Sequence, residues 1–292
     1  MLSLGIISSY YPKDFKEAIR EIKKDGFTCL VLENSVGKTD LEDLDAKQCR
    51  EIRNVIRDEG LYLAAISADA NIVASDPEKR KNNIGRVKKL IKLSNELGSP
   101  YVVSEVGTFS KLGWTHHEKN DTEEGYQEAY EIVLDIVKYA YDYGATFLVE
   151  PYIATVINSV EKVQRLFADL HHGSLGLLMD VSNYFSVDNI DNMDSEIDRI
   201  FNAVGDKVKI AHAKDLYKTD KADYPSATER HLHISGGIAL PAPGLGILNH
   251  KKVYERLYRI DPNMPLIIEH IDYPDIKRCK KFLDDVLKEI GR

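Results

Sequence analysis

Short apolar runs alternate with amphipathic runs along this chain of 292 residues. The apolar runs are rich in Val, Ile and Leu, and they are continuous rather than interrupted at every second position. This pattern is typical of strands that are buried on both faces, as in a parallel sheet. The predicted strands are Leu2–Ser8, Thr28–Asn34, Leu61–Ala68, Tyr101–Val106, Thr146–Tyr152, Leu175–Val181, Val208–Ala213 and Pro265–Ile271.

The amphipathic runs between these strands predict helices. Many of them begin with Asp, Ser, Thr or Asn, whose side chains cap the free N–H groups of a first turn. Their predicted starts lie near Asp14, Asp45, Asp76, Thr122, Ser159, Asp194, Asn249 and Pro274. Several end at a glycine, which accepts the left-handed conformation that closes a helix. The clearest period of three and four residues is formed by Tyr126, Ala129, Val133, Ile136, Val137 and Ala140.

Strand–helix units that repeat without a linker predict an α/β protein with a closed (β/α)₈ TIM barrel, one domain over residues 1–292. A doubly wound parallel sheet is the alternative. One segment, Leu216–Leu248, lies between the seventh strand and its helix and has no regular pattern. A connection of this length in a compact domain is usually functional or mobile.

The composition of the chain limits which partners and which cellular compartment we expect. The chain has 47 acidic and 39 basic residues and a net charge of −8, which argues against nucleic acid or an anionic membrane as partner. Its three cysteines, Cys29, Cys49 and Cys279, are widely spaced, so we expect a reducing cytoplasm and neither a disulfide framework nor a cysteine zinc site. The first residues lack the pattern of a signal peptide, and no run is long enough to span a membrane. A homo-oligomer is compatible with the sequence.

The last four predicted strands end in polar residues: Glu150, Asp180, His212 and Glu269. The first three are spaced by about one strand–helix unit, and the fourth follows the long loop. The active groups of a barrel lie at these strand ends. Each residue alone could be a hydrogen-bonded polar side chain. Three converging carboxylates would repel one another without a cation, however, and with an imidazole they suit one divalent ion, Mn²⁺, Co²⁺, Mg²⁺ or Zn²⁺.

This ligand set favours one kind of chemistry. A divalent ion that coordinates a carbonyl and an adjacent hydroxyl polarises both, so the neighbouring C–H proton becomes acidic and an enediolate can form. One carboxylate can take that proton and a second can return it. The outcome is isomerisation or epimerisation, or dehydration if a β-hydroxyl leaves. The expected substrate is a small molecule with a carbonyl beside a hydroxyl, as in a sugar or polyol.

The runs "LVEPY", "LLMDVSNYF", "KIAHAKD", "APGLGI" and "LIIEHID" resemble the sugar-phosphate isomerase/epimerase family of xylose isomerase-like barrels. That family includes ketose 3-epimerases and inosose dehydratases. The resemblance implies that Glu150, Asp180, His212 and Glu269 hold the metal ion. It also implies that Glu150 and Glu269 act as acid and base on opposite faces of the substrate.

The chain departs from the epimerases at two places. Asn183 stands where they carry a substrate-binding histidine, and Lys214 and Asp215 follow His212 where they carry an arginine. The "HAKD" form is more similar to the dehydratase branch. A keto-sugar dehydratase is therefore the alternative function.

Five residues are further substrate-binding candidates: Asn183, Lys214, Asp215, His117 and His233. The first three are close to predicted metal ligands in sequence, so each could instead support a ligand from behind. His117 follows the fourth strand on the expected catalytic side, and His233 belongs to the long loop. Either histidine could be an ordinary surface residue.

Two other functions use the same kind of barrel. An apurinic endonuclease would require three metal ions, more inward histidines and a basic face for DNA. A non-catalytic sugar-binding barrel would require no metal ion. The metal content per chain distinguishes both from an isomerase with one ion.

Overall fold

Eight parallel strands close into a barrel in the order β1-β13-β9-β8-β7-β6-β5-β2. This is a computed structural model, and it describes residues 1–221 and 234–291. The barrel strands are β1 (Ser3–Ile7), β2 (Cys29–Glu33), β5 (Tyr62–Ser67), β6 (Tyr101–Glu105), β7 (Thr146–Glu150), β8 (Leu175–Met179), β9 (Val208–Ala213) and β13 (Pro265–Ile268). The first strand pairs with both β2 and β13. The predicted (β/α)₈ barrel is confirmed, because a doubly wound sheet would leave two edges open.

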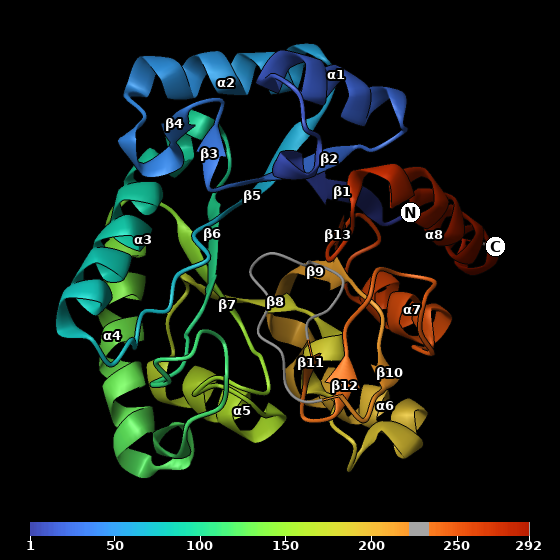
Figure 1. Ribbon diagram of the computed structural model, residues 1–292. Helices are drawn as coiled ribbons and strands as arrows, with labels where there is room; N and C mark the ends of the chain where they lie inside the picture. The colour runs from blue at the N-terminus through green and yellow to red at the C-terminus, as the bar shows by residue number, and fades with distance from the viewer. Residues whose placement is uncertain (222–233, 292) are drawn as a thin grey trace.

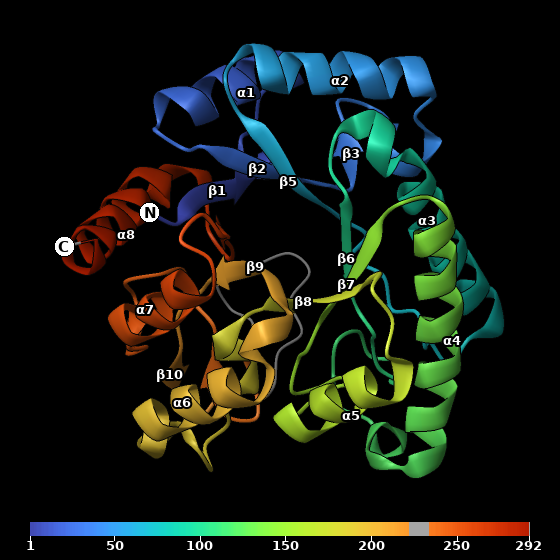
Figure 2. The ribbon, with the colours of Figure 1, turned by 180° about the vertical axis from the view of Figure 1, so that it is seen from behind.

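A helix follows each barrel strand, and the helices form an outer ring, as Figure 1 shows and Figure 2 repeats from behind. They are α1 (Phe15–Lys24), α2 (Ala46–Asp58), α3 (Pro77–Leu97), α4 (Glu123–Asp142), α5 (Val160–Leu170), α6 (Met193–Val204), α7 (His250–Ile260) and α8 (Ile276–Ile290). None of the described helices is both long enough and apolar enough to cross a membrane.

Side-chain caps fix most of the helix starts. The predicted residues that accept backbone N–H groups are Asp14, Asp45, Asp76, Thr122, Ser159 and Asn249. Helix α8 begins later than predicted, because Tyr273–Asp275 forms a separate 3₁₀ turn before it. At the other end of a helix, Gly98 closes α3 with a φ of +90°, a conformation that a side chain would strain.

The core lies between the strands and the outer ring of helices. All five residues of β8 are buried, as its continuous apolar pattern predicts. The six residues of the predicted apolar stripe of α4 are also buried. Full burial of a large aliphatic side chain contributes about 1.5–3 kcal/mol, so this layer holds the strand ends in fixed positions.

The segment between β9 and α7 is not wholly irregular, so that expectation was wrong for its described part. Three short strands form an antiparallel sheet beside the barrel: β10 (Tyr217–Lys218), β11 (Ile234–Ser235) and β12 (Ile238–Ala239). Gly236 and Gly237 both have positive φ, as a two-residue hairpin turn requires. A second small hairpin, β3 (Ser35–Val36) with β4 (Thr39–Asp40), follows β2.

Candidate functional site

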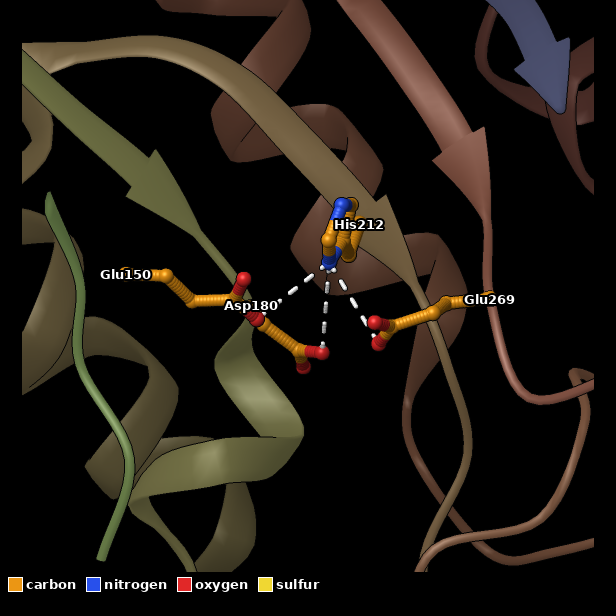
Figure 3. A group of neighbouring side chains, drawn as sticks. All are labelled: Glu150, Asp180, His212 and Glu269. Carbon is orange, nitrogen blue, oxygen red and sulfur yellow. Dashed lines mark ion pairs between the residues drawn. The ribbon is translucent and has the colours of Figure 1, made fainter. Parts of the chain in front are cut away.

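Four side chains converge at the carboxyl ends of neighbouring barrel strands (Figure 3). Glu150 is the last residue of β7, Asp180 follows β8, His212 lies near the end of β9 and Glu269 follows β13. One donor atom from each of the four lies within 4.8 Å of the others. The structure therefore brings together the four residues that the strand ends predicted.

The imidazole of His212 lies at the centre of this cluster. Its Nδ1 is 3.3 Å from Glu150 Oε1, 3.4 Å from Glu269 Oε2 and 4.0 Å from Asp180 Oδ2. The side chain of Glu269 is 18% exposed and the other three are buried. Charged groups of this kind are costly to bury unless they are paired or bound to a metal ion.

Three buried atoms of the cluster lack a well-oriented hydrogen bond to any described residue and could instead coordinate a metal ion. Within the described chain, His212 Nδ1 is buried without a well-oriented hydrogen bond, and so are Asp180 Oδ2 and Glu269 Oε2, although both oxygens form ion pairs with the Lys214 ammonium. Carboxylate oxygen and imidazole nitrogen are ligands of Mn²⁺, Co²⁺ and Zn²⁺, and Mg²⁺ takes the oxygens. A divalent ion held by Glu150, Asp180, His212 and Glu269 would satisfy these atoms.

Lys214 brings a positive charge to the cluster. Its buried ammonium is 2.6 Å from Glu269 Oε2 and 2.9 Å from Asp180 Oδ2, and it donates a hydrogen bond of 3.2 Å to Asn183 Oδ1. Asn183 in turn donates to Glu150 Oε1 at 3.0 Å. Asn183 and Lys214, two of the three residues that depart from the epimerase pattern, therefore link three of the four cluster residues.

The two glutamates have opposite tendencies to hold a proton. Burial raises the pKa of Glu150. Burial acts on Glu269 in the same direction, but the Lys214 ammonium and the His212 imidazole outweigh it and hold the pKa of Glu269 well below its ordinary value. For His212, burial is outweighed by Glu269 and Glu150, which raise the pKa of the imidazole well above its ordinary value. A metal ion would therefore compete with a proton for His212.

Glu150, His212 and Glu269 line one side of a cavity of about 230 Å³, whereas the fully buried Asp180 is not part of its lining. The opposite side carries carboxyl groups from the first half of the barrel, Glu33, Asp69 and Glu105. Glu105 and Glu150 occupy equivalent positions in the register of β6 and β7. Burial, followed by repulsion from Glu150 and Asp69, raises the pKa of Glu105 well above its ordinary value. Burial raises the pKa of Asp69 in spite of Arg86.

Sequence reasoning missed Asp69 and Glu105. A signal was present, because the run "YVVSE" ends in a glutamate in the same way as the run "TFLVE". Strained backbone gives a second indication that only the structure supplies. Asn34, Asp69 and His270 have positive φ without being glycine, and all three line the cavity. Such conformations gather at binding and catalytic sites.

The other predicted residues lie in different places. Asn183 and Lys214 line the cavity. His117 lies outside the described cavity lining; its Nδ1 accepts the N–H of Lys119 and caps a short 3₁₀ turn. His233 lies outside the described residues.

Asp215 lies behind the cavity wall, where it anchors the β9–α7 loop. Its 1% exposed carboxylate accepts the backbone N–H groups of Leu216, Leu248 and Gly244 at 2.8–3.0 Å. It also pairs with the buried His250 Nε2 at 3.0 Å. A Cβ at Gly246 would lie 2.4 Å from Asp215 Oδ1, so the loop can approach this closely only at a glycine.

Replacement of Asp215 by asparagine is expected to lower the free energy of unfolding by about 3–5 kcal/mol, because it leaves part of a buried charged network unpaired. Burial alone would raise the pKa of Asp215, but His250 and the backbone N–H groups outweigh burial and hold this pKa below its ordinary value. The carboxylate therefore stabilises the fold above the unfolded pKa of about 3.9 and loses this effect as the pH falls through the folded pKa.

Guanidinium unfolding at several pH values measures this contribution. The difference between parent and variant should be largest near neutral pH and should shrink in acid. A variant whose unfolding free energy stays within about 0.5 kcal/mol of the parent at neutral pH would contradict the anchoring role.

The family model of the xylose isomerase-like TIM barrel matches residues 17–287 of the chain. A D-tagatose 3-epimerase-like protein superposes with a TM-score of 0.74 at 19% identity, over 99% of this chain and 98% of that one. A xylose isomerase-like TIM barrel protein from Mycobacterium smegmatis, in complex with magnesium, has a TM-score of 0.70 at 18% identity, with 99% and 96% covered.

A third similar structure is a probable 3-DHS dehydratase from Bacillus anthracis. It has a TM-score of 0.70 at 15% identity, with 100% of this chain and 99% of that chain covered. No curated protein sequence matches the chain. At identities this low, the similarity to these structures shows the fold alone. The family model, however, matches nearly the whole length of the chain, and the chain belongs to the xylose isomerase-like TIM barrel family.

Proposed function

We propose that this protein is a metal-dependent isomerase or epimerase of a small sugar or polyol with a carbonyl group. The observation that carries the proposal is the convergence of Glu150, Asp180, His212 and Glu269, three of which present buried atoms without a well-oriented hydrogen bond. The cavity beside them, at about 230 Å³, is smaller than the pockets that enclose drug-sized ligands. A substrate of about one sugar unit fits this size.

The four residues would hold one divalent ion. When bound, such an ion supplies Lewis acidity, which makes a proton next to a carbonyl easier to remove. Side chains that support these four residues from outside are also present. Asn183 donates a hydrogen bond to Glu150, and Lys214 pairs with Asp180 and Glu269. Outer partners of this kind orient ligands.

Glu269 and Glu150 are the proposed proton-transfer pair. They come from β13 and β7, on either side of the strands that carry His212 and Asp180. The lowered pKa of Glu269 suits a base that takes the proton, and the raised pKa of Glu150 suits an acid that returns one. Two titratable groups whose surroundings push their pKa values apart are typical of an acid–base pair.

Substrate hydroxyl groups would be bound by the remaining polar side chains of the cavity. Lys214 and Asn183 lie beside the cluster, and Asp69 and Glu105 lie on the opposite side. Carboxyl groups and amides form directional hydrogen bonds to hydroxyls, so these side chains would select the arrangement of hydroxyls along the substrate. His117 and His233 are further candidates for substrate binding.

A keto-sugar dehydratase is the second candidate. It is favoured by the Lys214 ammonium at 2.6 Å from Glu269, because a fixed cation in the site can stabilise the negative charge that develops on a departing β-hydroxyl. The similarity to a probable 3-DHS dehydratase is in accord with this reaction.

The test is a screen of free ketoses, phosphorylated ketoses, inososes and keto-glycosides in deuterated water, with Mn²⁺ or Co²⁺ added to metal-free protein. Deuterium at the carbon beside the carbonyl, with retention of all oxygens, supports isomerisation or epimerisation. An unsaturated product supports dehydration. A protein that binds no divalent ion and exchanges no substrate proton would refute both, and a content of three ions per chain would favour a hydrolase.

A further inference from the structure

His270 directly follows Glu269 and has an unusual backbone. Its φ is +56°, in the left-handed region that residues other than glycine rarely adopt. A conformation of this kind costs about 1–3 kcal/mol and persists only where the surroundings fix it. The side chain is 14% exposed and lines the cavity. The residue is therefore held in a strained position at the edge of the candidate metal centre.

A hydrogen bond to the β9–α7 loop accounts for this position. His270 Nδ1 donates to the backbone oxygen of Leu240 at 2.8 Å. On the other side of the ring, Nε2 lies 3.9 Å from Glu269 Oε2. The imidazole thus lies between the loop and one carboxylate of the cluster.

Leu240 is the cavity-lining residue that the described part of this loop contributes. It is 3% exposed and follows the short strand β12. The next residue, Pro241, accepts the backbone N–H of Asp215 at 2.9 Å, which secures the loop from behind. On the cavity side, the bond from His270 attaches the same stretch of chain to the end of β13.

We propose that His270 is a positioning residue, which holds Leu240 as an apolar wall of the cavity beside Glu269. The effect on turnover rests on the proposed function, whereas the effect on the loop does not. The strained backbone is the cost of bringing the ring between Leu240 and Glu269. A left-handed residue with a side-chain N–H at the place of Nδ1 is what this position requires.

Two variants separate the side chain from the backbone. His270→Gly keeps the left-handed conformation without strain but removes the donor. His270→Asn also tolerates that conformation, and its amide nitrogen occupies the place of Nδ1. His171→Gly is a matched control, because His171 is also left-handed, with a φ of +38°, but closes helix α5 away from the cavity.

Amide hydrogen exchange over residues 234–242 reads the loop directly. His270→Gly should exchange about 10-fold faster there, the effect of losing one hydrogen bond. Titration with Mn²⁺ reads the cluster, and the same variant should keep the parental affinity, because His270 Nε2 lies 3.9 Å from Glu269 Oε2, beyond hydrogen-bond distance. On any substrate that the screen identifies, kcat should fall more than KM changes. His270→Asn should restore loop protection and most of kcat, and His171→Gly should match the parent.

Parent-like exchange in His270→Gly would overturn the proposal, and so would a His270→Asn variant as impaired as His270→Gly. The proposed function fails by a different result, namely a parent protein that binds no Mn²⁺ and exchanges no substrate proton. In that case amide exchange still decides whether His270 holds the loop.

Discussion

Replacement of Glu150 or Glu269 by glutamine should lower the rate of proton exchange on a keto-sugar substrate by about 10²–10⁴-fold, the usual contribution of a positioned acid or base. Glutamine keeps the size of the side chain and an oxygen that can face a metal ion, but it cannot take or return a proton. The two residues reach the cluster from β7 and β13, so each variant should block transfer on one side only. The measurement is deuterium incorporation from solvent, with bound metal determined on the same samples.

The opposite pKa directions sharpen this prediction. Glu269, whose pKa is held low in the metal-free cluster, should be the base in the first transfer, so Glu269→Gln should slow wash-in of deuterium more than Glu150→Gln does. Glu150→Gln should still permit slow exchange while product formation stops. If both variants hold metal and exchange at the parental rate, the two-glutamate mechanism is wrong, and another residue of the cavity is the base.

Replacement of His212 by alanine should strongly weaken metal binding. Loss of a residue that only hydrogen-bonds to a metal ligand costs about 10–100-fold in affinity, and loss of His212 should cost more. The reason is that its Nδ1 faces all three carboxylates of the cluster, and its removal takes away the single nitrogen donor. Titration of metal-free protein with Mn²⁺, Co²⁺ and Zn²⁺ measures the effect, which should be greatest for the metals that prefer nitrogen.

Asp215→Asn is the control for this second prediction. Asp215 lies three residues after His212 and is also buried, but its carboxylate faces the loop and not the cluster. The Asp215→Asn variant should be less stable than the parent but should keep the parental metal affinity. Equal loss of metal in both variants would refute this separation of binding from loop anchoring.

The sequence by itself determined the barrel and the four cluster residues. Continuous apolar runs specify strands buried on both faces, and caps such as Asp14 and Asp45 specify where helices begin, because these signals are local. The strand ends followed from the same pattern. Glu150, Asp180, His212 and Glu269 could be placed together because the carboxyl ends of all strands in such a barrel meet at one face.

The tertiary structure alone decided which neighbours of these residues face the cavity. Lys214 and Asp215 are adjacent, yet one contacts the cluster and the other the loop, because consecutive residues of an extended chain point to opposite sides. Glu105 became a cavity residue through its register with Glu150. His270 acquired a partner through Leu240, 30 residues earlier in the chain. Contacts of this kind depend on how distant segments pack, which no local pattern encodes.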